Sequence, residues 1–152
     1  MTGGRLKAIA PYLAGDELFC FTYGDGVANI DLGALVAFHR SHGRKATLTS
    51  VAPPGRFGAL EMDGDLIRRF REKPEGDGGR INGGFFVASP SVLDLVDNPG
   101  IIWEREPLER LAAAGELAAY RHDGYWAAMD TLRDKLALED LWARGVAPWK
   151  VW

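Results

Sequence analysis

Apolar residues in the first third of the chain fall into short runs that glycines and charged residues separate. Residues 17–23 are apolar and aromatic for the length of one buried strand, which stops at the Gly-Asp-Gly turn of 24–26. Asp31 can cap a helix with one apolar face, and Gly43 stands where a left-handed C-terminal cap would need it. A strand over 45–51 completes a strand-helix-strand crossover unit, which predicts a sheet that is at least partly parallel.

The rest of the chain predicts a hairpin and then alternating strands and helices. Two short apolar runs, 59–62 and 66–70, flank a turn and are typical of a hairpin. The pattern further predicts strands over 81–88 and 117–121, and helices over 89–96, 105–114 and 131–143. The last helix carries a broad apolar face, made of Leu132, Leu136, Leu138, Leu141 and Trp142. Without repeats or a linker, 1–152 is interpreted as a single α/β unit.

Composition fits one globular domain and excludes several protein classes. The chain has 152 residues, of which 47% are hydrophobic and 26% are charged. A net charge of −3 gives no basic surface for non-specific binding to nucleic acid or to an anionic membrane. The single cysteine, Cys20, lies in an apolar run and is expected to pack as a small hydrophobe. Because no apolar run approaches the roughly 18 residues that span a bilayer, we expect a soluble, cytoplasmic protein.

Two aspartates are candidate metal ligands. Asp25 lies between glycines just past the end of a buried strand, where open α/β sheets bind ligands. Plain turn chemistry is the alternative for this triplet. Asp130 directly precedes the last helix, where an N-cap is the alternative. If the two carboxylates converge, they suit a hard cation such as Mg²⁺, which takes one or two carboxylates together with substrate phosphates. The spacing leaves their convergence open.

Two other polar segments could bind a ligand. Glu72 and Lys73 end the hairpin, where the lysine could neutralise a phosphate and the glutamate could accept sugar hydroxyls. An exposed salt-bridging face is the alternative interpretation. Asn82 and Gly83 begin a predicted strand and could present an amide to a ligand across bare backbone, or could simply form a bulge at a bend.

Several common catalytic motifs are missing from the sequence. His39, His42 and His122 have no serine or cysteine partner at a recognisable nucleophile elbow, and they do not form a His-Glu-x-x-His motif. Neither a Gly-x-x-x-x-Gly-Lys-Ser/Thr loop nor a Gly-x-Gly-x-x-Gly fingerprint occurs. The sequence therefore contains no recognised phosphate cradle.

Seven short motifs taken together resemble the sugar-phosphate nucleotidyltransferases. They are TGGR at 2–5, YGDG at 23–26, PGRFG at 54–58, EKP at 72–74, NGGFF at 82–86, WEREPL at 103–108 and MDTLRD at 129–134. The resemblance covers essentially the whole chain and is greatest for members that transfer cytidylyl groups to glucose 1-phosphate. It implies an α/β, Rossmann-like nucleotidyltransferase fold with a mixed, mostly parallel sheet.

The resemblance also implies a reaction and roles for particular residues. An oxygen of glucose 1-phosphate would attack the α-phosphorus of CTP in line, with Mg²⁺ bound, to give CDP-glucose and pyrophosphate for nucleotide-sugar biosynthesis. By the family pattern, Asp25 and Asp130 would bind the metal and act in catalysis. Arg5 and Gly24 would bind the nucleotide. The sugar phosphate would be bound by Glu72, Lys73, Asn82 and Gly83. The implied partners are these small molecules, not nucleic acid or membrane, and a homo-oligomer is left open.

One departure from the family pattern is large. The family begins with a strand and a Gly-rich loop that carries a Thr-Arg pair and is followed by a lysine, and none of this precedes Met1. The chain therefore resembles the carboxyl-terminal part of such an enzyme, with the first strands of the sheet and most of the CTP site missing. Two hypotheses follow: a cytidylyltransferase that is inactive alone because it is truncated, or a non-catalytic remnant that binds sugar phosphate or assembles with full-length subunits.

A glycosyltransferase is the third hypothesis, because Asp63 and Asp65 match the Asp-x-Asp cation motif of many such enzymes. A hairpin turn is the favoured interpretation of these two residues. Exchanging both aspartates for asparagine should abolish glycosyl transfer if they bind the cation. If they only form a turn, the variant should bind ligand as the wild type does.

Overall fold

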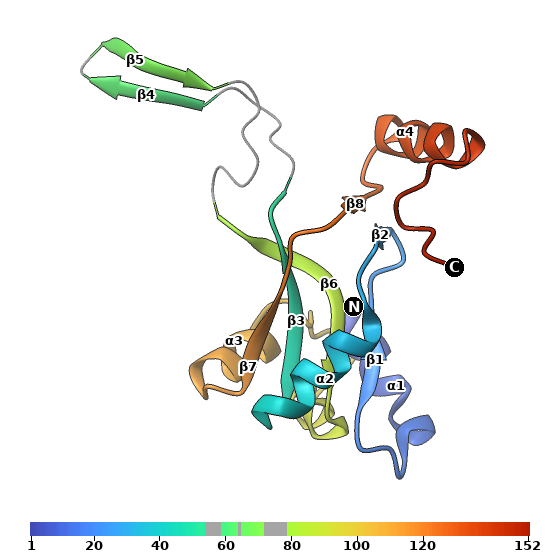
Figure 1. Ribbon diagram of the computed structural model, residues 1–152. Coiled ribbons are helices and arrows are strands. Elements are labelled where there is room, and N and C mark those ends of the chain that lie inside the picture. Colours follow the sequence, from blue (N-terminus) through green and yellow to red (C-terminus); the bar gives the residue numbers. More distant parts are fainter. Residues whose placement is uncertain (54–58, 64, 72–78) are drawn as a thin grey trace.

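The computed structural model describes residues 1–53, 59–63, 65–71 and 79–152, and its centre is a four-stranded sheet (Figure 1). The strands lie in the order β1 (Phe19–Phe21), β6 (Ile81–Ala88), β3 (Ala46–Val51) and β7 (Leu117–His122). Strand β6 is antiparallel to β1 and to β3, whereas β3 and β7 are parallel.

The prediction of a mixed sheet is confirmed. The prediction that the sheet is mostly parallel holds for the direction of the strands but not for the pairing of neighbouring strands. Strands β1, β3 and β7 run the same way, yet β3 with β7 is the single parallel pair among the described strands of this sheet. The reason is that β6 returns between β1 and β3 against their direction, so the crossover from β1 to β3 does not join neighbouring strands.

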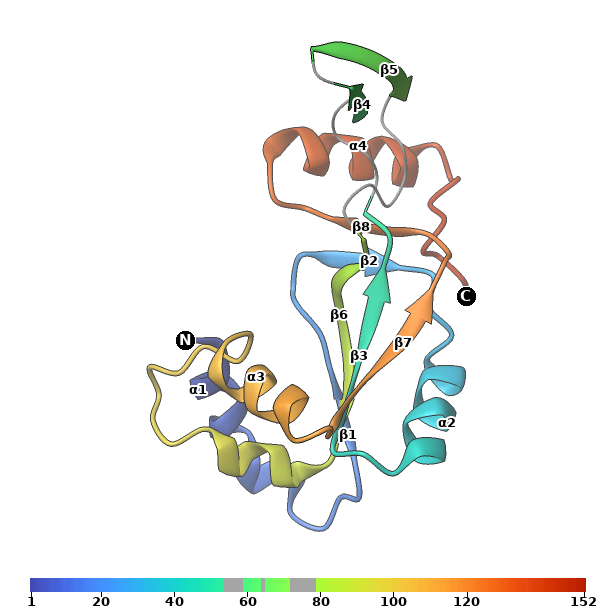
Figure 2. The same ribbon diagram turned by 90° about the vertical axis from the view of Figure 1, so that its left-hand side faces the viewer.

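Helices cover both faces of the sheet (Figure 2). Helix α2 (Leu32–His42) lies on one face, where Leu35 packs with Ile30 and Val87. The elements on the other face are α1 (Thr2–Ala8), the 3₁₀ helices η1 (Ala10–Leu13) and η2 (Pro90–Leu95), and α3 (Glu106–Ala113). The larger cluster of buried residues, with Trp103 and Phe86 among its members, lies on this second face.

Aromatic rings pack one face of the short strand β1 into the core. The ring of Phe21 stacks on that of Phe86 at 4.6 Å between centroids, and both rings meet Trp103 edge-on. Because side chains alternate along a strand, Phe19 and Phe21 point into this core and Cys20 points away from it. The expectation that Cys20 packs as a buried hydrophobe is therefore wrong: its side chain is exposed.

The predicted helix caps are present. The Asp31 side chain accepts a hydrogen bond from the Ala34 amide at 2.9 Å, and Gly43 ends α2 with φ of +63°. Helix α4 (Leu132–Ala143) begins with a capping box, in which Thr131 and Asp134 bond each other's backbone amides. No residue of the predicted apolar face of α4 is buried, and Leu132, Leu136 and Trp142 are exposed.

Two small antiparallel sheets complete the fold. Strands β4 (Ala59–Asp63) and β5 (Leu66–Arg71) confirm the predicted hairpin, and Arg68 forms an ion pair with Asp63 at 2.7 Å. The predictions missed the pair of β2 (Gly26–Ala28) and β8 (Trp126–Ala128), because strands of three residues carry no periodic pattern. They also missed helix α1. The longest described helix, α4, has 12 residues, so no described helix is long enough to cross a membrane.

A buried polar group joins α2 to β3. The Thr47 hydroxyl lies 2.9 Å from Nδ1 of His39 and 2.8 Å from Nε2 of His42. Since Nδ1 of His42 accepts the Arg44 amide proton at 3.0 Å, Nε2 of His42 carries the ring proton and donates to Thr47. The Thr47 hydroxyl can then donate to His39, so every bond in the group is made while both imidazoles are neutral.

This group predicts loss of stability in mild acid. Burial, reinforced by the neighbouring His42, lowers the pKa of His39 below its value in the unfolded chain. The unfolded state therefore takes up a proton more readily, so the stabilisation is present above about pH 6.5 and is lost as the pH falls below it. The urea midpoint should drop between pH 7.5 and pH 5.5, and His39→Gln should flatten that drop. An equally steep drop in the variant would show that His39 is not the source of this pH dependence.

Candidate active site

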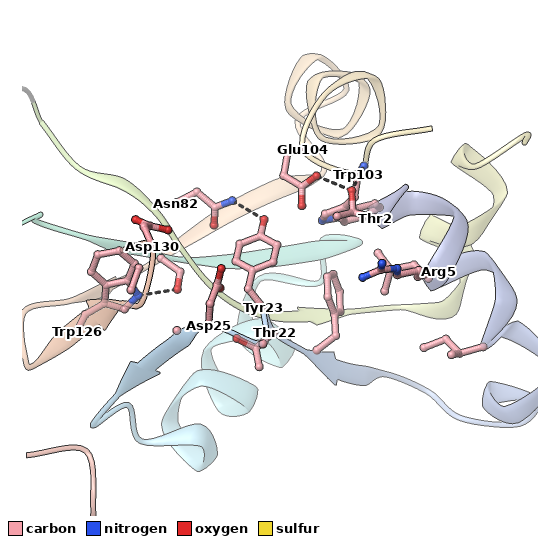
Figure 3. Close-up of a pocket in the computed structure, with 17 residues that line it drawn as sticks. Thr2, Arg5, Thr22, Tyr23, Asp25, Asn82, Trp103, Glu104, Trp126 and Asp130 are labelled. Carbon is pink, nitrogen blue, oxygen red and sulfur yellow. Dashed lines mark hydrogen bonds between the residues drawn. The ribbon is translucent and has the colours of Figure 1, made fainter. Parts of the chain in front are cut away.

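A cavity of about 600 Å³ lies where β1 ends, between α1, the β2–β8 pair, the first residues of β6 and the segment before α3 (Figure 3). Most of the residues predicted as a site line it: Arg5, Gly24, Asp25, Asn82, Gly83 and Asp130. Predicted Glu72 and Lys73 lie outside the described residues. The fold therefore gathers segments from both ends of the chain around one cavity.

The β2–β8 ladder brings the two aspartates to one wall of the cavity. Gly26 pairs with Ala128, and the Met129 amide donates to the Asp25 carbonyl at 2.8 Å, which extends the ladder by one step. Asp130 follows directly, so the two carboxylates belong to the same end of an antiparallel pair. Figure 3 shows both beside Trp126 and Asn82, with Arg5 toward the opposite end. The two aspartates, 105 positions apart in the sequence, thus line the same cavity.

Gly24 and Asp25 form a turn, and the backbone on both sides of Asp25 is open. Neither Gly24 nor Gly26 has the positive φ for which turns reserve glycine, and a Cβ atom added to either would meet nothing within 4 Å. Neither turn conformation nor packing therefore requires these glycines. The open space beside this backbone lets a ligand approach it closely, as proposed for Gly24.

Strand β6 begins with a bulge that faces the cavity. Asn82 pairs with Ser50 and Phe86 with Leu48, so three residues of β6 stand opposite Thr49 alone. Gly84 has φ of +74°, and Phe85 has φ of +48°, a value that costs a non-glycine residue energy. Of the two alternatives for this segment, the bulge is present, and Asn82 and Gly83 also line the cavity.

Side chains from neighbouring strands satisfy the backbone of this bulge. The Trp126 indole donates to the Gly83 carbonyl at 2.8 Å, and the Thr49 hydroxyl donates to the Phe85 carbonyl at 2.9 Å. The Phe85 amide donates to the hydroxyl of Thr22 at 3.3 Å. These bonds replace the sheet bonds that the bulge gives up, and they hold the strained backbone in place.

Helix α1 contributes Thr2 and Arg5 to the cavity. Its amino end packs closely on the 99–101 segment, since a Cβ atom on Gly3 or Gly4 would clash there with backbone atoms. The Trp103 amide donates to the Thr2 hydroxyl at 2.9 Å, and this hydroxyl donates to the Glu104 carboxylate at 2.6 Å. Arg5 is the one cationic side chain among the described residues that line the cavity.

Sequence reasoning gave no role to three further polar residues of the cavity: Thr2, Tyr23 and Glu104. The Tyr23 hydroxyl accepts a hydrogen bond from the Asn82 amide at 3.0 Å. Burial raises the pKa of Tyr23, and the negative charges of Glu104 and Asp25 raise it further, so the hydroxyl stays protonated. Each residue lies in one of the seven motifs, which was the available signal, but their contacts join distant parts of the chain.

The donor set of the cavity suits a hard cation. No group of three or more His, Cys, Asp or Glu side chains among the described residues could hold a metal by itself. Asp25 and Asp130 offer two carboxylates, which matches Mg²⁺, an ion that keeps water and phosphate oxygens as its other ligands. The described lining has no imidazole or sulfur atom, as a zinc site would need.

The cavity thus lies beyond the end of β1 and has two aspartates in its lining. The profile of the nucleotidyl transferase family matches residues 5–130, and the chain belongs to this family. The resemblance noted from the seven motifs is thereby confirmed.

Individual proteins that are similar to this chain are the following. Over all 152 residues the chain is 60% identical to glucose-1-phosphate cytidylyltransferase from Salmonella typhi, and it spans 59% of that relative's length. It is 34% identical to mannose-1-phosphate guanyltransferase from Debaryomyces hansenii over an alignment 143 residues long, which covers 90% of this chain and 40% of that relative. The crystal structure of HddC from Yersinia pseudotuberculosis superposes with a TM-score of 0.66 at 21% identity, covering 90% of this chain and 60% of HddC. That likeness shows the fold alone.

The bulge predicts that Gly84 cannot be replaced without cost. A Cβ atom there would lie 3.0 Å from the Tyr23 ring, on a backbone with φ of +74°. Gly43→Ala is a matched control, because Gly43 has φ of +63° and nothing within 4 Å of its added Cβ. We expect the control to lose about 1 kcal/mol of unfolding free energy in urea titrations. Gly84→Ala should lose roughly 1 kcal/mol more because of crowding. Equal losses would contradict the packing described.

Proposed function

We propose that this chain carries the glucose 1-phosphate side and the metal ligands of a cytidylyltransferase, which makes CDP-glucose and pyrophosphate from CTP and glucose 1-phosphate. The observation that carries the proposal is the 60% identity to glucose-1-phosphate cytidylyltransferase across the whole chain. The cavity supports it, because six of the residues that the reaction would use line one space of about 600 Å³. That volume lies within the range of small-molecule sites.

The sugar-phosphate end of the cavity would use Asn82 and Gly83. The Asn82 amide offers a donor and an acceptor for sugar hydroxyls, and bare backbone at Gly83 lets the ring come close. Glu72 and Lys73 remain the predicted grip on the phosphate. Arg5, at the other end, would bind the nucleotide, where a guanidinium can pair with phosphate oxygens.

The carboxylate wall would hold the cation. Asp25 and Asp130 are the residues that would bind Mg²⁺, which supplies charge neutralisation to reacting phosphate groups when it is bound. The backbone bond between Met129 and Asp25 fixes the spacing of the two elements that carry these carboxylates. The chain's own part in catalysis would be positioning and charge placement, which are the main contributions to phosphoryl-type transfer.

The chain alone is not expected to turn over at an enzymatic rate. A nucleoside triphosphate carries about four negative charges and needs several cationic or backbone partners. Among the described residues that line the cavity, Arg5 is the one cationic partner for a triphosphate. The chain also spans only 59% of the length of its cytidylyltransferase relative.

A chimera tests the function directly. The 152-residue chain would be joined to the part of the Salmonella typhi relative that the match leaves uncovered, in the relative's own order. With CTP, glucose 1-phosphate and MgCl₂, we expect the chimera to form CDP-glucose and the chain alone to form none at a comparable rate. Asp25→Asn and Asp130→Asn chimeras should lose at least 100-fold in kcat, on the order of a lost metal ligand.

Two outcomes would contradict the proposal in different ways. A folded chimera without activity, from a chain that still binds glucose 1-phosphate, would favour the non-catalytic remnant. CDP-glucose formation by the chain alone at the chimera's rate would show that the rest of the relative is dispensable.

A further inference from the structure

We propose that Tyr23 is a positioning residue for sugar recognition: its hydroxyl fixes the orientation of the Asn82 amide, and Glu104 holds that hydroxyl from the other side. The inference rests on the proposed function, because it concerns the site for glucose 1-phosphate. It assigns a role to two cavity residues, Tyr23 and Glu104, that lie outside the set predicted from the sequence.

The two bonds of the Asn82 side chain settle which way its amide points. The Gly84 amide donates to one end of it at 2.9 Å, and a backbone N–H can only donate, so that end is the carbonyl oxygen Oδ1. The other end must then be the NH₂ group, which donates to the Tyr23 hydroxyl oxygen at 3.0 Å. A rotation of 180° would break both bonds at once. One N–H of the amide has no partner among the described residues and is left for a ligand.

Packing fixes the Tyr23 ring that supplies this acceptor. The ring meets Phe86 edge-on, with centroids 5.9 Å apart, and Gly84 leaves the space that lets the ring pass beside the bulge. Tyr23 and Asn82 are 59 positions apart in the sequence. Tyr23 follows the end of β1, and Asn82 lies at the start of β6. The hydroxyl therefore stands at a set place relative to the bulge that carries Asn82.

Glu104 completes the arrangement because a carboxylate can only accept hydrogen bonds. It accepts a hydrogen bond from the Thr2 hydroxyl at 2.6 Å and another from the Tyr23 hydroxyl. With the Tyr23 proton directed to the carboxylate, the tyrosine oxygen presents its lone pairs to Asn82. Figure 3 shows the three side chains in this order along the cavity, from Asn82 through Tyr23 to Glu104.

A fixed amide matters for affinity. An asparagine that is free to rotate presents donor and acceptor in either order, and a ligand must then pay for ordering it. Held by Gly84 and Tyr23, Asn82 offers the remaining N–H on one side only. Tyr23 would thus favour sugar phosphates with an acceptor oxygen at that place without itself touching the ligand.

Calorimetric titration of the 152-residue chain with glucose 1-phosphate in MgCl₂ tests this by a double-mutant cycle. Tyr23→Phe keeps the ring and removes the hydroxyl, so it should weaken binding about 3- to 10-fold, as loss of one hydrogen bond does. Asn82→Ala should weaken it at least as much. If Tyr23 acts through Asn82, the double variant should bind no more weakly than Asn82→Ala alone. Tyr12→Phe, whose hydroxyl lies on a side chain 85% exposed, is the matched control.

A second readout needs no ligand. In ¹H–¹⁵N spectra, Tyr23→Phe should shift the side-chain amide resonances of Asn82, and Tyr12→Phe should not. Unchanged affinity in Tyr23→Phe, losses that multiply in the double variant, or a Tyr23→Phe chain that no longer folds would each overturn the proposal. A wild-type chain that does not bind glucose 1-phosphate would instead contradict the proposed function, and the inference would fail with it.

Discussion

The bulge at the start of β6 is the constraint on which the site depends. It takes residues 83–85 out of the sheet ladder directly after Asn82, and it holds Phe85 at a positive φ. Such a conformation persists only where the surroundings enforce it, and here they do so through Thr22, Thr49 and Trp126. Since Trp126 belongs to β8, one hydrogen bond ties the Asn82–Gly83 side of the cavity to the strand that leads to Asp130. A change in the bulge would therefore move both walls.

The distribution of charge divides the cavity into regions with different chemistry. Asp25, Asp130 and Asn82 lie toward one end, Arg5 lies toward the other, and Tyr23 and Glu104 stand between them. Carboxylates repel a bare phosphate, so the aspartate end suits a phosphate only when a cation accompanies it. The neutral amide of Asn82 beside them suits the uncharged hydroxyls of a sugar. This order agrees with a sugar phosphate that lies along the cavity.

Local patterns predicted much of the fold. The helix from Asp31 to Gly43 and the strand over 81–88 follow from capping residues and apolar runs, and both were confirmed. The place of β6 between β1 and β3 could not be predicted, because strand order depends on contacts between distant segments. The same limit applies to the site: Asp25 and Asp130 were predicted as residues, but their convergence rests on a ladder of three-residue strands. Tyr23 and Glu104 could not be predicted as site residues, because their hydrogen-bond partners lie 59 and 102 positions away in the sequence. That strands of the sheet are missing stays a prediction.

The central claim is that Asp25 and Asp130 form one cation site, and Mn²⁺ binding to the chain tests it most directly. Mn²⁺ takes the same oxygen ligands as Mg²⁺, and its effect on water-proton relaxation reports bound ion. We predict that Asp25→Asn and Asp130→Asn each weaken Mn²⁺ binding about 10-fold or more, a loss of at least 1.4 kcal/mol, and that the double variant binds no more weakly than the weaker single. Asp97→Asn, an exposed aspartate outside the cavity, should bind as the wild type does. Wild-type affinity in either single variant would contradict the claim.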